Sequence, residues 1–397
     1  MTTPYILQNH GRAASPRRRW GRGLLALAAV LILLAGAAAL AMRSRVGPPP
    51  RSPDLTTPPD APLQTNGVRQ TPQVTPVAPP PSAFRHVVFP TDQTDLLQTD
   101  KPGVVQPTAA GKPESALYGS VRLVNRGSHL MTSFHEGVDI APTQRDRRGR
   151  PVDAAHAIAD GRVAHINRIP GNSNYGNYVV LLHADPLGEV YTLYAHLAAI
   201  APGLAAGQPV QAGTVLGAMG NTPVNIIPVD RSHLHFEIGM VNNTRFDAWF
   251  HAQKLKPDHG NFNGWNLLAV DPLAFFRAQR QAKEFKFRSY LQEVPKAFEI
   301  LVPCRAQIDY FRRYAALWQS PPFQGGEMVI ACSENGVPLA GRQARDGEAP
   351  PRGKARAVVL TVDEKALGRN GCHLITRDSR GWRLTANGER WLQILTY

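Results

Sequence analysis

Apolar and polar side chains alternate through residues 232–238, whose sequence is SHLHFEI. Side chains two residues apart lie on the same face of a β-strand. We therefore expect His233, His235 and Glu237 to share one face and the three apolar residues between them to point into a core. The stretch predicts a rigid strand that carries two imidazoles side by side.

Further short runs of strand type, separated by turn residues, recur between residues 117 and 240. They cover residues 117–123, 157–166, 178–182, 190–197 and 215–219. Asp160-Gly161 predicts a hairpin turn, and no long segment in this region has the helical period. The pattern predicts a mainly β fold, a compact domain of antiparallel strands that begins at residue 116.

The chain beyond this region predicts a helix and then a second module. Asp271 followed by Pro272 is typical of a helix start, and we expect this helix to run to about Lys286 and to close a domain of residues 116–286. Residues 287–397 are interpreted as a separate α+β module of unknown role. This module contains all three cysteines, Cys304, Cys332 and Cys372. Their spacing excludes a C-x-x-C zinc site and leaves open one disulfide with a free thiol or three buried thiols.

Residues 24–42 form an apolar run of 19 residues without a charge. At a rise of about 1.5 Å per residue, a helix of this length nearly matches a bilayer core of about 30 Å. A secretory signal cleaved near residues 39–41 is the competing interpretation, but the run is longer than a typical signal core. We predict a transmembrane helix that anchors the chain, with residues 1–23 as a basic cytoplasmic tail and the remainder exported, periplasmic or otherwise extracytoplasmic.

Residues 43–115 are rich in Pro, Thr, Gln, Asp and Ser. Such a composition buries too little apolar surface to offset the loss of chain entropy, and it favours extended, polyproline-like conformations. We predict a disordered linker that carries the β domain away from the inner membrane of the cell.

The charge of the chain changes this picture only slightly. The formal net charge is +14, but residues 1–46 contain seven arginines and no acidic residue. The remaining excess mildly favours anionic partners such as cell-wall polymers or lipid headgroups. No block of interleaved arginines and aromatic residues is found, so nucleic acid is not an expected partner.

Candidate chemistry lies in three motifs within the predicted β domain. His135 and Asp139 are four residues apart with a glycine between them, His196 follows in a strand-like run, and residues 232–238 come last. A hydrolytic zinc site uses three ligands from His and Asp or Glu and keeps one position open for water. His135 and Asp139 fit such a set, and the residues alone leave open whether His233 or His235 completes it.

These three motifs, in this order and at these separations, resemble the LytM/lysostaphin-type zinc metallopeptidases of peptidase family M23, which cut peptides in bacterial cell walls. The resemblance covers residues 117–240. It implies a LytM-like antiparallel-sheet fold and a Zn²⁺ ion bound by His135, Asp139 and His235. It also implies that His196 and His233 are catalytic, one acting on the water and the other stabilising the tetrahedral intermediate.

We therefore expect a membrane-anchored zinc endopeptidase that hydrolyses peptide cross-links of bacterial peptidoglycan. The alternative is a non-enzymatic LytM-type adaptor that regulates cell-wall hydrolases, because the segment of residues 221–230 is longer than the usual turn and could cover the site. Glu237 is either a partner that orients a histidine ring or an ordinary surface residue. A protein partner for residues 287–397 and the oligomeric state are left open.

Overall fold

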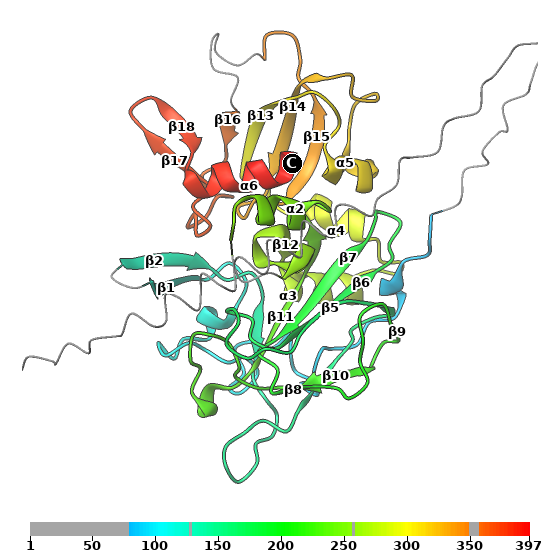
Figure 1. Cartoon of the computed structure of the whole chain (residues 1–397), viewed down its shortest axis with the longest axis vertical. Coiled ribbons are helices and arrows are strands. Elements are labelled where there is room, and N and C mark those ends of the chain that lie inside the picture. Colours follow the sequence, from blue (N-terminus) through cyan, green and yellow to red (C-terminus); the bar gives the residue numbers. More distant parts are fainter. Residues whose placement is uncertain (1–78, 127–128, 256–258, 349–356) are drawn as a thin grey trace, which may run out of the picture. The chain divides into compact units, whose positions relative to one another are not determined.

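The computed structural model describes residues 79–126, 129–255, 259–348 and 357–397 (Figure 1). The predicted cytoplasmic tail, the membrane segment 24–42 and the linker up to residue 78 lie outside the described residues. Within the described ranges, no helix has the length and apolar character needed to cross a bilayer.

The central element is an antiparallel sheet in the order β12-β11-β7-β6-β5-β9, with β3 also paired to β11 (Figure 1). Every pair of strands in it is antiparallel. Its strands are β3 (Val138–Ile140), β5 (Gly161–Asn167), β6 (Tyr178–His183), β7 (Val190–Ala195), β9 (Pro209–Val210), β11 (Leu234–Val241) and β12 (Leu267–Val270). The predicted mainly β, antiparallel architecture is confirmed for the described chain.

Two smaller units complete the β domain. One is a sheet in the order β4-β10-β8, and the other is the hairpin β1-β2. Their strands are β1 (Val121–Arg126), β2 (His129–Phe134), β4 (Ala154–His156), β8 (Ala199–Ile200) and β10 (Val215–Ala218). The strand expected at residues 117–123 therefore starts later, at Val121, after the 3-10 helix η2 (Pro113–Ala116).

The hairpin expected at Asp160-Gly161 is wrong. The strand before it, β4, pairs with β10, whereas the strand after it, β5, pairs with β6 and β9. Gly161 also lacks the positive φ that a tight type I′ turn requires. Glycine is required at this position for a different reason, because a Cβ there would lie 2.7 Å from Nδ1 of the buried His183.

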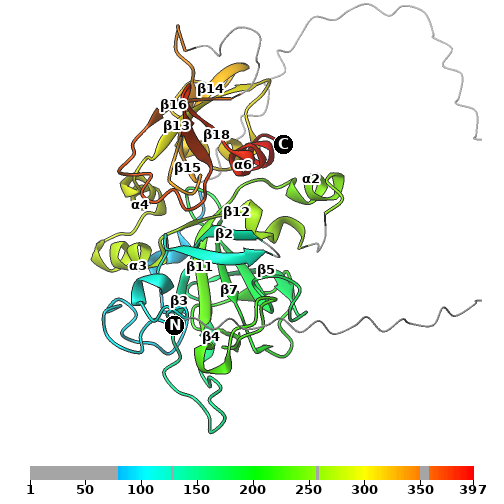
Figure 2. The same ribbon diagram turned by 90° about the vertical axis from the view of Figure 1, so that its left-hand side faces the viewer.

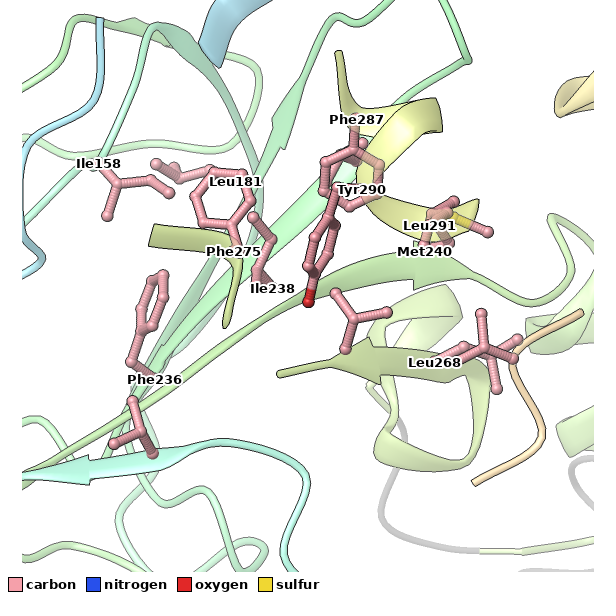
Figure 3. Packing of buried hydrophobic residues seen from close by; sticks show 14 of the residues in the cluster. Ile158, Leu181, Phe236, Ile238, Met240, Leu268, Phe275, Phe287, Tyr290 and Leu291 are labelled. Atoms are coloured by element: carbon pink, nitrogen blue, oxygen red, sulfur yellow. The ribbon is translucent and has the colours of Figure 1, made fainter. Parts of the chain in front are cut away.

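The alternation in residues 232–238 is confirmed by the packing of β11. Leu234, Phe236 and Ile238 are fully buried in the main hydrophobic core. Figure 3 shows Phe236 and Ile238 among apolar side chains from the helices α3 (Pro272–Gln281) and α4 (Phe287–Glu293). These helices therefore cover the face of the sheet opposite to the histidines.

Helix α3 begins as expected. The carboxylate of Asp271 accepts hydrogen bonds from the backbone N–H groups of Leu273 and Ala274, at 2.8 and 3.2 Å. The helix ends at Gln281 rather than near Lys286, and α4 follows as a separate helix.

The structure differs from the expected linker over residues 79–115, which pack on the β domain. Phe84, in the 3-10 helix η1 (Ala83–Arg85), is fully buried and contacts the rings of Phe275 and Phe287 at centroid distances of 5.3 and 5.7 Å. Leu96 and Val105 are buried as well. The segment has no core of its own, so its isolated apolar residues gain burial only by adding to a core formed elsewhere in the chain.

Residues 287–397 form an α+β unit, as predicted. Among the described residues of this range, an antiparallel sheet in the order β15-β14-β13-β16 lies with the hairpin β17-β18 and three α-helices, the first of which is α4. The bounds are β13 (Phe298–Cys304), α5 (Asp309–Arg313), η6 (Ala315–Leu317), β14 (Gly326–Cys332), β15 (Pro338–Gln343), β16 (Val358–Val362), β17 (Ile375–Asp378), β18 (Gly381–Leu384) and α6 (Ala386–Thr396). The three cysteines are free thiols.

This C-terminal unit is not separate from the β domain, because one hydrophobic core includes residues of both. Asn335 donates a hydrogen bond to the carbonyl oxygen of Ala269 in β12 at 2.7 Å, and Asn243 donates to that of Ile394 in α6 at 2.8 Å. Four short elements lie in the connecting parts of the chain: η3 (Val229–Arg231), α2 (Phe246–Ala252), η4 (Gly260–Phe262) and η5 (Gly264–Asn266).

Candidate metal centre

Three of the sequence-predicted site residues meet at one point. The antiparallel register places His235 of β11 directly opposite Asp139 of β3, and His135 lies in the segment that enters β3. His135 Nε2 is 3.0 Å from Asp139 Oδ1 and 3.1 Å from His235 Nδ1, and the last two atoms are 3.0 Å apart. All three side chains are buried. Together they form a group that could hold a metal ion.

Gly137, between His135 and Asp139, makes this close pairing possible. A Cβ at this position would lie 2.3 Å from the carbonyl oxygen of Phe236 and 2.9 Å from Cε1 of His235. Any side chain here would therefore push β3 away from β11 and separate the three candidate ligands.

The hydrogen bonds on the far sides of the two rings allow their tautomers to be assigned. His235 Nε2 lies 2.8 Å from Glu237 Oε1, which accepts, so Nε2 carries a proton and Nδ1 is the ring atom that could bind a metal. His135 Nδ1 lies 2.9 Å from the carbonyl oxygen of Leu117, so Nδ1 carries the proton and Nε2 a lone pair. Arg122 Nη2 is also 3.1 Å from His135 Nδ1, but its two hydrogens are taken by Ser115 O and Asp139 Oδ2.

Three atoms that can each bind a cation thus face one another in a buried space. Such an arrangement is unfavourable unless a cation lies among the acceptors. Two imidazole nitrogens and one carboxylate oxygen are a donor set that suits Zn²⁺, and they leave a fourth position for water. The residues present therefore fit the zinc ion that the sequence predicts.

Arg122 of β1 holds the other oxygen of Asp139. Its Nη2 donates to Asp139 Oδ2 at 2.6 Å, and its Nη2 and Nε both donate to the carbonyl oxygen of Ser115. Burial raises the pKa of Asp139, but His135, His233 and Arg122 outweigh burial and hold this pKa well below its usual range. Asp139 is therefore ionised, with Oδ1 directed at the site and Oδ2 at Arg122.

Glu237 orients His235 and is not a surface residue. It is 1% exposed, and its second carboxylate oxygen accepts a hydrogen bond from Tyr191 Oη at 2.9 Å. Burial lowers the pKa of His235, but the hydrogen bonds to Asp139 and Glu237 outweigh it and raise the pKa to about 9. Burial and then the charge of Glu237 raise the pKa of the neighbouring Glu136 to about 7.

The two further histidines lie beside the three acceptors. His233 Nε2 is 3.4 Å from Asp139 Oδ1, and its Nδ1 donates to the carbonyl oxygen of Arg231 at 2.8 Å. The ring of His196 lies 5.0 Å from that of His233 and 5.5 Å from that of His235. The short distances of His235 to both other atoms make it the better candidate for a third ligand, and His233 lies beside the group.

His196 is held in an unusual backbone conformation. It has a φ of +65°, in the left-handed region that non-glycine residues rarely adopt. Its backbone N–H and its ring Nδ1 both point to the carbonyl oxygen of Tyr175, at 2.9 and 3.3 Å. Burial, with the nearby His233 and His235, lowers the pKa of His196 well below its usual value. The ring is therefore neutral, with Nε2 able to accept a proton.

The segment of residues 221–230, which precedes His233, is hydrogen-bonded to neighbouring loops. Val224 N–H donates to the carbonyl oxygen of Ser173 at 2.8 Å, and Arg145 Nη1 donates to that of Val229 at 2.9 Å. The side chain of Ile226 is 91% exposed and points into solvent. The segment is thus held by two neighbouring loops, and the side chain of Ile226 does not fill the site.

Sequence reasoning missed Arg122 and Tyr191. Arg122 lies in a segment where polar and apolar residues alternate, and Tyr191 lies in a run of strand type. Neither has a short, fixed spacing to a site residue. Their hydrogen bonds to Asp139 and Glu237 form only because strand pairing brings these residues together.

Comparison with known proteins gives one family. Residues 133–248 match the model of peptidase family M23, which confirms the resemblance seen in the sequence. None of the curated proteins searched matches the chain. Among solved structures, the catalytic domain of lysostaphin from Staphylococcus simulans is 24% identical, with 41% of this chain and 89% of that one covered and a TM-score of 0.25.

Two other solved structures are similar at comparable levels. A catalytic-domain mutant of the prophage-encoded M23 protein EnpA from Enterococcus faecalis is 19% identical, with 38% of this chain and 88% of that one covered and a TM-score of 0.23. A zinc-containing peptidase from Vibrio cholerae is 25% identical, with 30% and 33% covered and a TM-score of 0.20.

Proposed function

We propose that this chain, whose residues 133–248 match peptidase family M23, is a zinc metalloendopeptidase that hydrolyses peptide cross-links of bacterial peptidoglycan. The observation that carries the proposal is the buried set of His135 Nε2, Asp139 Oδ1 and His235 Nδ1, each within 3.1 Å of the others. The imidazoles of His196 and His233 stand beside that set, so both a candidate metal position and a candidate base are present.

His135, Asp139 and His235 would hold the zinc ion. When bound, zinc lowers the pKa of its water toward about 7 and polarises the carbonyl of the scissile bond. The residues of the chain then have distinct tasks. Glu237 and Leu117 O keep the two ligand rings in the tautomers that expose the required lone pairs.

His196 and His233 would move protons and stabilise charge beside that position. In each ring, Nδ1–H donates to a backbone carbonyl oxygen, so Nε2 is available to the site. A neutral Nε2 can take a proton from water, and the resulting imidazolium can donate to an oxyanion. Sequence and geometry leave the division of these two roles between His196 and His233 open.

The location of the activity is part of the proposal. The apolar segment 24–42, with most of the nearby arginines before it, supports a single-pass inner-membrane anchor with the catalytic domain in the periplasm. Residues 43–78 would then be the tether, since the following residues pack on the domain. The substrate class is consistent with this placement.

The full chain, purified in detergent, should release peptides from isolated cell-wall sacculi. Activity should disappear with a zinc chelator, return on addition of zinc and be absent in His235→Ala. His156→Ala is the matched control, because His156 lies outside the candidate site and pairs with Asp92. If sacculi remain intact at every zinc concentration, the hydrolase proposal fails and the non-enzymatic adaptor becomes the better explanation of an intact fold.

A further inference from the structure

The proposed function gives no role to the segment of residues 221–230, although this segment lies between the parts of the chain that carry both candidate catalytic histidines. His196 directly follows β7 and His233 directly precedes β11, and these two strands pair antiparallel (Figure 2). The N–H of His233 donates to the carbonyl oxygen of Gly220 at 3.1 Å. The segment is therefore a loop whose base is closed at His233.

Thr222 joins this loop to two other stretches of the chain. Its Oγ1 accepts a hydrogen bond from the backbone N–H of Asn177 and donates one to the carbonyl oxygen of Leu197, both at 2.9 Å. Its carbonyl oxygen accepts from the N–H of Gly171, also at 2.9 Å. A Cβ on Gly176 would lie 2.3 Å from the carbonyl carbon of Thr222. The hydroxyl thus bridges two stretches, and the close contact with Gly176 leaves Thr222 little room to move.

The two residues that Thr222 bridges hold the backbone next to His196. The N–H of Leu197 donates to the carbonyl oxygen of Asn177 at 3.0 Å, and Asn177 Nδ2 donates to that of Leu197 at 3.1 Å. His196 itself donates from its N–H to the carbonyl oxygen of Tyr175. Because the φ of His196 is +65°, its conformation persists only where the surrounding structure holds it. The bridge made by Thr222 is part of that structure.

We propose that Thr222 is a positioning residue for His196, and that its hydroxyl fixes the backbone conformation that keeps this ring beside His233 and His235. The inference rests on the proposed function in one respect, because it takes His196 to act in the reaction. A hydroxyl is needed because it both accepts and donates. Valine has nearly the same shape but can do neither, so it would leave the N–H of Asn177 without its acceptor. The long loop is then a support for His196.

The first test observes the ring of His196 in the metal-free chain and requires no hydrolysis. The full chain in detergent is labelled with ¹⁵N in its histidine rings, and the signals of His196 are identified by their loss in His196→Gln. At about pH 8, where an ordinary imidazole is neutral, we expect a single tautomer with the proton on Nδ1. In Thr222→Val the two nitrogen signals should move toward the average of both tautomers. Thr222→Ser keeps the hydroxyl and should keep the wild-type signals.

The second test measures hydrolysis of a muropeptide that has one defined cross-link. The kcat of Thr222→Val should fall by about 10- to 100-fold, because a small misplacement of a catalytic group has an effect of this size. KM and the zinc affinity, measured by chelator competition, should stay within about twofold, and Thr222→Ser should recover most of kcat. The matched control is Thr192→Val, which removes a fully buried hydroxyl that contacts His183 and Tyr194. It should keep both kcat and the signals of His196.

Signals of His196 that are identical in wild type and in a folded Thr222→Val would overturn the positioning role. A zinc affinity that falls in parallel with kcat would also overturn it, because the substitution would then disturb the whole site. Thermal unfolding shows whether Thr222→Val is folded. If it is not, the wild-type spectrum decides, since averaged nitrogen signals would mean that the ring is not held. Absence of hydrolysis in the wild type would count against the proposed hydrolase and leave the spectra unchanged, so the two proposals fail separately.

Discussion

The buried contact between Glu237 and His235 allows a sharp prediction about metal binding. Glu237→Gln keeps the shape of the side chain and removes its charge. The amide oxygen can still accept from His235 Nε2, now at 2.8 Å, and the amide nitrogen can donate to Tyr191 Oη, now at 2.9 Å. The ring orientation is therefore retained, while a charge-assisted hydrogen bond becomes a neutral one of roughly half its strength.

Loss of such an orienting partner lowers metal affinity by about 10- to 100-fold, which corresponds to roughly 1.4 to 2.8 kcal/mol. Because Glu237 is 1% exposed, solvent cannot replace the lost charge, and we expect a value within this range. Competition with a chromophoric zinc chelator measures the affinity directly. Glu189→Gln, at an exposed ion pair with Arg162, is the control that should leave zinc affinity unchanged.

A zinc affinity of Glu237→Gln within about twofold of wild type would refute the reasoning, provided that the variant is folded. Such a result would mean that the carboxylate serves only as the hydrogen-bond acceptor of the buried Tyr191 and does not affect metal binding by His235. Circular dichroism and the unfolding midpoint of the metal-free variant separate the two explanations, because a purely structural role would change the midpoint and leave the affinity alone.

Two further predictions concern stability. Phe84→Ala should lower the free energy of unfolding, measured in urea titrations, by about 3 to 5 kcal/mol, because it removes a fully buried aromatic ring. The control Arg85→Ala, at an exposed position, should change this free energy little. If both variants have equally small effects, residues 79–115 are a linker, as the sequence predicts. Burial lowers the pKa of His183 from its usual 6.5 to about 4, so the unfolded chain binds a proton that the folded chain does not. The free energy of unfolding of the wild-type protein should therefore fall by roughly 3 kcal/mol from pH 7 to pH 4. In His183→Gln the decrease over the same pH range should be smaller. Parallel pH profiles of the two proteins would contradict the lowered pKa of His183.

Local features of the fold, and candidate metal ligands that the structure brings close together, could be predicted from the sequence. The period of two in residues 232–238 requires no knowledge of distant residues, because it states only which side chains share a face of one strand. The cap at Asp271 is equally local, since its carboxylate bonds the backbone two and three residues later. Errors arose where a local signal was ambiguous, as at Asp160-Gly161, whose glycine avoids a clash with His183 and does not form a turn.

The amino-acid sequence by itself determined the strand that carries the imidazoles, the residue types of a zinc site and their order along the chain. Only the tertiary structure favours His235 over His233 as the candidate third ligand, because the register of β3 against β11 joins Asp139 and His235 across 96 residues. The same holds for the contact of Arg122 with Asp139 and for the buried position of Phe84. The physical reason is that each of these depends on surfaces brought together by strand pairing and core packing, and neither leaves a fixed spacing in the sequence.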